Sequence, residues 1–590
     1  MKRRRSASAD FFFFGVLIYT NHMAAKHWVI RAFPEDEMQA VFSGEPAIVQ
    51  RLLWRQDIRT REAADVFLSP DYVAHVHDPF LLKDMERAVS RITDAIRSNE
   101  KIIIFGDYDA DGICGSVVFH DFFRAVDFAN FQNYIPHRYE EGYGLKMRHI
   151  EEFASGGAKL LITIDCGVTN YKEIERASVL GMDVIVIDHH IVPPQWPPAY
   201  AIIDYKHPDD AYPSKYLSGA GLAFKVVQGI LVRGTWPVTL EWSKWLLDVV
   251  AIAGVADMVP ILGENRVLVH YGLKVLSRAR RAGLKELYRT QRMGVNPTIT
   301  SDTIGFTIAP RINAASRMGH ATTGFEFLTT ESSEEARWLV TRLEGENEDR
   351  KKLVEEICIE LKKEIAKLSE LPPVFYFGKK EWLPGVLGIA ATRLVEEYGR
   401  SAFLYGGAPD HIKGSCRTAS GINAVEVMRA CADTLLDFGG HQAAGGFSLE
   451  EKNVGAFGCK LREVIARELD NPQPVEIVLE AELRAGDVTW EAFNTVERFQ
   501  PFGQENKKPL FLLRDAQVVS AQVFGSGGKH LRLGLADNAR TVSALKFNAP
   551  REWMDVVAVG AHVDAVVSFD LNEWNGNREL RLRLEDIRLS

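Results

Sequence analysis

Three aspartates stand at alternate positions directly after an apolar segment. Asp107, Asp109 and Asp111 follow residues 101–106, whose sequence Lys-Ile-Ile-Ile-Phe-Gly is typical of a buried strand. Three carboxylates at one strand end repel one another and lose hydration on burial, so cations are usually needed to hold them together. The pattern therefore predicts a metal site at the end of a strand.

Two later segments repeat this arrangement. Residues 160–164 and 184–187 are short apolar runs. Runs of this kind alternate with helical stretches between residues 101 and 205, which predicts an α/β fold with a parallel sheet and right-handed crossovers. Ligands of such sheets bind beyond the carboxyl ends of the strands, so we expect the residues that follow the runs to meet at one edge. These residues are Asp165, Asp188, His189 and His190.

A further candidate ligand ends a helical segment. Residues 217–260 read as two packed helices, the second from Trp242 to Ala256, and Asp257 follows directly. An acid that closes so apolar a segment needs a partner, which makes Asp257 a fourth source of metal ligands.

The alternative to a metal site is helix capping. A single aspartate after a strand most often caps the next helix, and Asp111 could act partly in this way. His190 could orient His189 or a substrate without binding metal. The clustering of acids from several segments favours the metal site over this alternative.

The residue types indicate which metal and which chemistry. Carboxylates mixed with imidazole favour Mn²⁺ or Mg²⁺ over metals that prefer thiolates. Two ions about 3.5 to 4 Å apart can orient and deprotonate a water and neutralise the charge that builds on a phosphoryl group. Asp165 is the expected bridging ligand, because it lies between the other two acid clusters in chain order.

Other segments carry candidates for phosphate binding. Guanidinium groups suit phosphate oxygens, although an arginine on a protein surface is usually only solvated. The glycine-rich segment 438–447 could form a nest of backbone N–H groups, or simply a tight turn between a strand and a helix. The candidate side chains are Arg311, Arg317, Ser415, Arg417 and His441.

Size, charge and cysteine content set limits on the fold and on partners. A chain of 590 residues exceeds what one core organises, so we expect three or four domains. The formal charge of -9 gives no overall attraction to nucleic acid, so such binding has to rest on local basic grooves. The six cysteines form no C-x-x-C pair, which argues against a zinc ribbon or a disulfide framework and favours reduced thiols in the cytoplasm.

The expected organisation has five parts. Residues 1–44 form an N-terminal extension whose basic and apolar start resembles a secretory signal without a clear cleavage site, and we favour translation from Met23 over export. The remaining parts are a helical lead-in with the catalytic parallel-sheet domain (45–285), a linker region with a long connecting helix (286–370), a second α/β domain (371–470) and a C-terminal β-barrel (471–590). Within the barrel, residues 524–532 place basic residues next to a loop and a strand, which is the layout of a single-strand-binding barrel. The alternative of a barrel that only packs against the enzyme stays open.

With these residues in place, the chain resembles the DHH phosphoesterase superfamily and, within it, the RecJ family of single-strand-specific 5′ to 3′ DNA exonucleases. The resemblance runs from about Glu45 to the C-terminus and is most specific at residues 106–112 and 188–190. Segments 78–89, 310–315 and 499–506, which shorter superfamily members lack, are also present. The fold that the resemblance implies is a DHH domain, a long connecting helix, a DHH-associated α/β domain and an OB-type barrel.

The resemblance also implies roles for individual residues. It implies two Mn²⁺ or Mg²⁺ ions bound by Asp109, Asp111, Asp165, His189 and Asp257, with Asp107 and His190 close by and also counted as catalytic. It implies a 5′-phosphate pocket from Arg138, Ser415 and Arg417. Contacts to the DNA backbone would come from Arg311, Arg317 and His441 in the DHH-associated domain. The expected partners are single-stranded DNA with a 5′ end, a single-strand-binding protein and a helicase, with no membrane and a monomeric chain.

The implied activity is release of 5′-mononucleotides from single-stranded DNA in recombination and repair. Two residues depart from the family pattern: Ser316 replaces a usual glycine and Leu383 a common histidine, which leaves substrate positioning near Trp382 open. Two other functions stay open at this point. One is a phosphodiesterase for short oligonucleotides or cyclic dinucleotides, and the other is an inactive DNA-binding scaffold.

Overall fold

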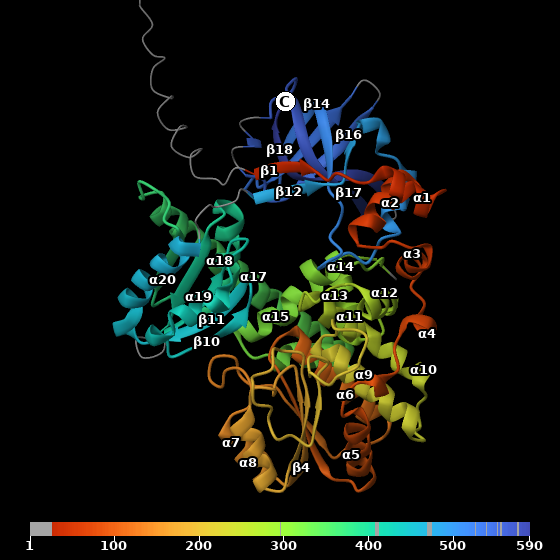
Figure 1. The fold of residues 1–590 in the computed structure, drawn as a ribbon, viewed down its shortest axis with the longest axis vertical. Helices are drawn as coiled ribbons and strands as arrows, with labels where there is room; N and C mark the ends of the chain where they lie inside the picture. The colour runs from red at the N-terminus through yellow and green to blue at the C-terminus, as the bar shows by residue number, and fades with distance from the viewer. Residues whose placement is uncertain are drawn as a thin grey trace, which may run out of the picture. The chain divides into compact units, whose positions relative to one another are not determined.

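The computed structural model describes residues 26–294, 297–407, 412–468, 475–525, 527–537, 540–550, 553–554, 557–574 and 577–590 (Figure 1). The chain divides into two compact units. Among the described residues, one unit comprises residues 30–347 and 479–590, and the other comprises residues 26–29 and 348–478. The predicted signal-like segment and Met23 lie outside the described residues.

The first unit contains the predicted parallel sheet. Its strand order is β3-β2-β4-β5-β6, and every neighbouring pair is parallel. The parallel-sheet prediction is therefore confirmed. The strands are β2 (Lys101–Gly106), β3 (Phe131–Tyr134), β4 (Ala158–Ile164), β5 (Asp183–Ile187) and β6 (Ala201–Ile203).

Helices cover both faces of this sheet because alternate residues of each strand point to opposite sides. Ile102 and Ile104 face α5 (Met85–Arg97), α6 (Ala110–Ala125) and α9 (Gly219–Arg233) in one core. Ile103 and Phe105 belong to a second core with α7 (Met147–Ser155) and α8 (Tyr171–Val179) (Figure 1). A sheet covered on both faces leaves only its strand ends open to ligands.

Helices precede the sheet, as predicted. Thr60 accepts a hydrogen bond from the Ala63 N–H and caps α3, as its position in the sequence indicates. Phe42 of α1 is buried in the same core as α2 and α3, so the folded chain begins before residue 45. The lead-in elements are α1 (Glu35–Phe42), α2 (Ala47–Arg55), α3 (Arg61–Leu68), α4 (Tyr72–His75) and the 3-10 turn η1 (Pro79–Leu81).

More helices follow the sheet. The helix predicted at 242–256 is split into α10 (Leu240–Ser243), the 3-10 turn η2 (Lys244–Leu246) and α11 (Leu247–Ala256). The long connecting helix predicted within residues 286–370 is α17 (Ser333–Ile365), and its residues fall in both units. Between them lie α12 (Gly263–Ser277), α13 (Ala282–Thr290), α14 (Ser301–Thr303), the π-helical turn η3 (Ile304–Ile308), α15 (Ala309–Met318) and α16 (Thr322–Thr329).

The second unit holds a mixed sheet of order β10-β11-β9-β8-β7, in which only β7 and β8 are parallel. The glycine-rich segment 438–447 forms the hairpin of β10 and β11, so the strand-to-helix turn considered above is wrong. Its strands are β7 (Val374–Lys379), β8 (Ser401–Gly406), β9 (Ile412–Arg417), β10 (Asp437–His441) and β11 (Ala444–Leu449). Its helices are α18 (Pro384–Tyr398), α19 (Ala424–Ala430) and α20 (Val454–Glu468), with the 3-10 turns η4 (Ala432–Thr434) and η5 (Glu451–Asn453).

The C-terminal part of the first unit is a closed barrel. Strands β14, β15, β16, β18 and β17 pair in this order, and β14 also pairs with β17. The barrel core continues into the lead-in helices, where Val49 and Leu53 contribute to the same cluster. The strands are β13 (Ala481–Leu483), β14 (Phe511–Phe524), β15 (His530–Ala536), β16 (Thr541–Lys546), β17 (His562–Trp574) and β18 (Asn577–Leu589), preceded by η6 (Ala485–Asp487) and α21 (Trp490–Glu497).

Two further findings concern the N-terminal strand and the helices. Strand β1 (Lys26–Ile30) pairs with β12 (Val475–Leu479) in a small separate sheet. Among the helices that the structure describes, none has the length and apolar character needed to cross a membrane.

Candidate metal centre and phosphate-binding residues

Strand register brings the predicted acids to one edge of the parallel sheet. Gly106 pairs with Ile164, Ile164 with Ile187, and Ile187 with Ile203. Neighbouring strands lie about 4.8 Å apart, so the residues that follow form a row, one acid per strand. The row is Asp107, Asp165, Asp188 and Asp204. Asp204 was missed from the sequence because β6 has only three residues and gives no clear strand signal.

Three groups of side chains in this region have ligand atoms within 4.8 Å of one another. Asp165 belongs to two of the groups, as expected for a bridging ligand, and His189 also belongs to two. All seven residues predicted as catalytic are present in the groups. The groups are Asp107, Asp109 and Asp165; Asp165, His189 and His190; and Asp111, His189 and Asp257.

The helices α6 and α9 fix the first acids. Asp109 caps α6 by accepting hydrogen bonds from the N–H groups of Asp111 and Gly112. Asp111, in the first turn of α6, accepts the N–H groups of Gly219 and Ala220 at 2.6 and 2.8 Å. The capping role considered above thus belongs to Asp109, and it coexists with membership of a metal group.

Burial and mutual repulsion raise the pKa values of four of these acids. Burial, followed by the charge of Asp109, raises the pKa of Asp107 to about 8 and the pKa of Asp111 to about 6. The pKa values of Asp165 and Asp257 are also well above the ordinary value, because both are buried next to Asp111. One carboxylate oxygen of Asp107 is buried without a hydrogen-bond partner. This donor set fits divalent cations, which would neutralise the charge and occupy that oxygen.

Asp188 orients the two histidines. Its Oδ1 accepts hydrogen bonds from the His189 N–H at 2.8 Å and the His190 N–H at 3.2 Å, and lies 2.8 Å from His190 Nδ1. Burial alone would lower the pKa of His190, but the Asp188 carboxylate raises it to about 9. The Tyr143 hydroxyl donates to the Asp165 carbonyl at 3.0 Å and lies 3.2 Å from His190 Nδ1. No spacing rule in the sequence pointed to Tyr143.

Three of the predicted phosphate-binding residues, Arg138, Arg311 and Arg317, lie in the same unit as the acids. The Arg138 guanidinium sits 4.6 Å from the ring centre of Tyr108, the residue between Asp107 and Asp109. Arg317 is on α15, and its carbonyl accepts a hydrogen bond from the Tyr139 hydroxyl at 2.6 Å.

Arg311 has a different environment from the one predicted. It lies on α15, so neither Arg311 nor Arg317 belongs to the second α/β domain. Its guanidinium is nearly buried and binds both carboxylate oxygens of Glu344 at 2.8 and 3.0 Å. It also donates to the Thr307 carbonyl at 2.5 Å. These contacts favour a structural role for Arg311, as the ion-pair partner of Glu344, over a role as a phosphate ligand.

Ser415, Arg417 and His441 form a set within the second unit. Ser415 and Arg417 lie on the same face of β9, because a Cβ on Gly388 would lie 2.9 Å from Ser415 Oγ and 3.2 Å from Arg417 Nη2. His441 pairs with Ala444, which pairs in turn with Arg417. The Arg417 guanidinium donates to the Cys416 carbonyl at 2.8 Å, and burial lowers its pKa. Its remaining N–H groups suit an anion.

The departures from the family pattern lie outside the three metal groups. Ser316 is buried in α15 and donates to the Asn313 carbonyl at 3.2 Å. Leu383 directly precedes α18, and the neighbouring Trp382 indole donates to Glu360 at 3.2 Å.

Comparisons with known proteins agree with this arrangement. Residues 101–253 match the DHH family, N-terminal domain; residues 371–467 match the DHHA1 domain; and residues 479–586 match the RecJ OB domain. The single-stranded-DNA-specific exonuclease RecJ of Bacillus subtilis (strain 168) is 33% identical over 548 residues, which cover 92% of this chain and 68% of the relative. The chain belongs to the RecJ family.

Solved structures of RecJ from Thermus thermophilus are similar over most of the chain. The structure in complex with Mn²⁺ has a TM-score of 0.79 at 29% identity and covers 96% of this chain and 80% of that one. The structure in complex with Mg²⁺ has a TM-score of 0.72 at 28% identity, covering 96% and 78%. The predicted order of a DHH domain, a DHH-associated domain and an OB-type barrel is confirmed.

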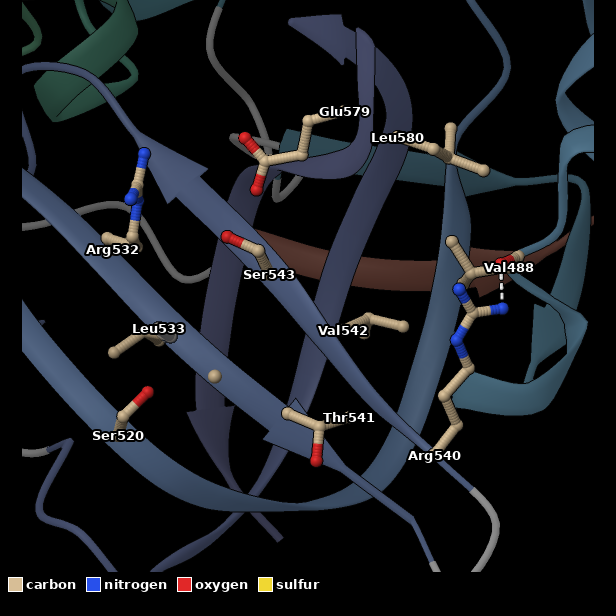
Figure 2. Close-up of a pocket in the computed structure, with 11 residues that line it drawn as sticks. Val488, Ser520, Arg532, Leu533, Arg540, Thr541, Val542, Ser543, Glu579 and Leu580 are labelled. Carbon is tan, nitrogen blue, oxygen red and sulfur yellow. Dashed lines mark hydrogen bonds between the residues drawn. The ribbon is translucent and has the colours of Figure 1, made fainter. Parts of the chain in front are cut away.

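The RecJ OB domain carries a polar cavity of about 380 Å³. Figure 2 shows Arg532, Ser543 and Glu579 around one end of it, and Arg540 at the other end, bound to the Val488 carbonyl at 2.9 Å.

An aromatic cluster lies at the start of β15, in the region that the sequence indicated for single-strand binding. The ring centres of Phe524 and Phe547 lie 5.2 and 5.3 Å from that of His530, and Phe547 is 46% exposed. The Arg532 guanidinium lies 5.9 Å from the Phe524 ring centre. Sequence reasoning missed this cluster because Phe547 directly follows β16, outside the segment that the sequence indicated.

Proposed function

We propose that this chain is a single-stranded-DNA-specific exonuclease that hydrolyses phosphodiester bonds from the 5′ end and releases 5′-mononucleotides. The proposed cofactor is a pair of Mn²⁺ or Mg²⁺ ions. The observation that carries the proposal is the row of acids at the sheet edge, where Asp165 is shared by two potential ligand groups. All the acids expected of an active member are present, which argues against an inactive scaffold.

The protein groups have distinct proposed roles. When bound, the two divalent ions supply an activated water and neutralise the charge that develops on the phosphoryl group. Asp165 and His189 each link two of the ligand groups, because each belongs to two of them. Asp188 fixes the ring of His190, and Tyr143 restrains the backbone of Asp165 through its carbonyl.

Strand polarity requires a group that recognises the 5′ end. Ser415 and Arg417 share one face of β9, and the fork of N–H groups on the Arg417 guanidinium suits two phosphate oxygens. Ser415 and Arg417 are the proposed ligands of a terminal 5′ phosphate. Arg138, in the unit that carries the acids, is a further proposed phosphate ligand. Arg317 and His441 are the proposed contacts to the backbone of the strand.

The OB barrel is the proposed binding surface for the rest of the strand. The rings of Phe524, His530 and Phe547 provide faces on which bases can stack regardless of sequence. Arg532 next to them provides a positive charge for the backbone.

A cellular setting follows from this activity. We place the enzyme in the cytoplasm as a monomer that acts in DNA recombination and repair. A single-strand-binding protein and a helicase are the proposed partners, since an enzyme restricted to single strands depends on proteins that open and protect them. The six free cysteines, five of them buried, agree with a reducing compartment.

A digestion time course tests the proposal. Single-stranded DNA with a 5′ phosphate, labelled at either end, is incubated with the protein and Mn²⁺, alongside duplex DNA and a dinucleotide. We expect immediate release of labelled mononucleotide from the 5′ end, slow loss of the 3′ label, and no digestion of the duplex or with a chelator. Release from the 3′ end, internal cleavage, or faster hydrolysis of the dinucleotide would contradict it.

A further inference from the structure

A buried arginine joins three distant segments of the first unit. Arg266 of α12 is only 2% exposed, and burial lowers its pKa to about 9. Its guanidinium packs 3.9 Å from the ring centre of Phe67 and donates to the Phe67 carbonyl at 2.9 Å. Its other hydrogen bonds go to the carbonyls of Phe499 at 3.0 Å, Gln500 at 2.7 Å and Pro501 at 3.2 Å. A buried charge satisfied by main-chain carbonyls fixes their positions closely.

The carbonyls of Phe499, Gln500 and Pro501 belong to the loop 499–506, which precedes the main strands of the barrel. Asn506 closes the loop internally by donating to the carbonyls of Phe499 at 2.8 Å and Pro501 at 2.9 Å. Gln56, which follows α2, donates to the Asn506 side chain at 3.1 Å. The loop is therefore held by Arg266 from outside and by Asn506 from within.

The far side of this loop contacts the segment that carries a metal-group residue. The Ile261 N–H donates to the Gln504 carbonyl at 2.9 Å. Gly503 lies against the Ile261 side chain so closely that an added Cβ would be 2.7 Å from Ile261 Cγ1. Ile261 is buried and follows Asp257 by four residues, in the short connection between α11 and α12.

We propose that the loop 499–506, clamped by Arg266, is a positioning element for Asp257, so that docking of the barrel sets the geometry of the group formed by Asp111, His189 and Asp257. The inference rests on the proposed function of that site. Asp257 ends α11 and Ile261 is fixed by the loop, so a displacement at Ile261 is transmitted through three residues. Asn265 of α12 also donates to the Pro260 carbonyl at 3.0 Å and so restrains this connection.

The group formed by Asp107, Asp109 and Asp165 shares no residue with the group that contains Asp257 and has none in this connection, so these two groups respond differently. A disturbance of the loop therefore weakens one cation site and spares the other. A general loss of stability would weaken both.

Gly503→Ala tests this inference in the full-length protein. Mn²⁺ binding to metal-free protein is measured by calorimetry and by the EPR signal of free Mn²⁺, neither of which depends on activity. We expect one of two sites to weaken at least about 10-fold, in the range seen when a group supporting a metal ligand is lost, while the other keeps its affinity. Adding Ile261→Ala, which makes room for the new methyl group, restores the weakened site.

A matched control uses a glycine under the same steric restriction elsewhere. A Cβ on Gly229 of α9 would lie 2.9 Å from Val89 Cγ2, and its other close neighbours, Met85 and Phe80, belong to none of the metal groups. Gly229→Ala is expected to bind both ions like the wild type. If Gly503→Ala does not fold, Ile261→Ala replaces it, since it empties the same contact and carries the same expectation.

Three results would overturn the inference while leaving the proposed function intact. The first is unchanged binding at both sites in a folded Gly503→Ala variant. The second is equal weakening of both sites in that variant, and the third is the same weakening in Gly229→Ala. Failure of the wild type to bind Mn²⁺ would instead refute the proposed function itself.

Discussion

Replacing Asp107 by asparagine is expected to stabilise the metal-free protein while impairing the metal-loaded one. Burial and the charge of Asp109 raise the pKa of Asp107 from its ordinary 3.8 to about 8. A carboxyl whose pKa is higher in the folded state contributes no penalty below its unfolded pKa. Its contribution to stability becomes increasingly unfavourable as the pH rises toward the pKa of the carboxyl in the folded state.

The size of the effect follows from the same values. Each pH unit above 3.8 costs about 1.36 kcal/mol. The free energy of unfolding of the metal-free protein is therefore lower by about 2 kcal/mol at pH 5 and by about 4 kcal/mol at pH 7. These are upper limits for the stability gained by Asp107→Asn, because the amide also loses contacts. Saturating Mn²⁺ offsets the penalty in the wild type, since free ligand at 100 times its Kd adds about 2.7 kcal/mol per site.

Urea unfolding between pH 5 and pH 8, with chelator or with Mn²⁺, measures both effects. With chelator, the stability of the wild type should fall with pH, and that of Asp107→Asn should fall less steeply. With Mn²⁺, the wild type should be more stable than Asp107→Asn, because the variant has lost a member of one ligand group. A wild type whose metal-free stability is flat across this range, or a variant with the same slope, would refute the reasoning.

The other predictions concern individual side chains. Asp165→Ala should abolish hydrolysis and leave the Kd for single-stranded DNA within a few-fold; Mn²⁺-dependent activity in this variant would remove Asp165 from the site. Arg417→Ala should reduce the preference for a 5′-phosphorylated over a 5′-hydroxyl strand at least 10-fold in kcat/KM, and an unchanged ratio would count against its role. Arg311→Met should lower the free energy of unfolding by about 1 to 3 kcal/mol, non-additively with Glu344→Ala in a double-mutant cycle, with little change in DNA affinity; the opposite pattern would make Arg311 a DNA ligand. Phe547→Ala should weaken binding of long strands by about 1 to 3 kcal/mol but not of a dinucleotide, and equal losses for both would exclude base stacking.

Much of the site could be predicted from local sequence, because each acid directly follows an apolar strand. A parallel sheet aligns its carboxyl ends, so chain order alone placed Asp107, Asp165 and His189 at one edge. The long helix α17 was also predictable, since its apolar spacing extends over many turns.

What could not be predicted depends on contacts between distant segments. Asp204 follows a strand of three residues, too short for a periodic signal. The pairing of Arg311 with Glu344 joins residues 33 positions apart, so the spacing of residues in the sequence did not indicate this ion pair. The hairpin at residues 438–447 was likewise ambiguous, because glycines suit turns, nests and strands that approach closely.

The central claim is that the acids at the sheet edge hold two divalent ions that act on a phosphodiester. Anomalous diffraction from crystals grown with Mn²⁺ tests it most directly. We predict two manganese peaks about 3.5 to 4 Å apart with Asp165 contacting both. A single peak away from Asp165, or none within reach of these side chains, would contradict the account.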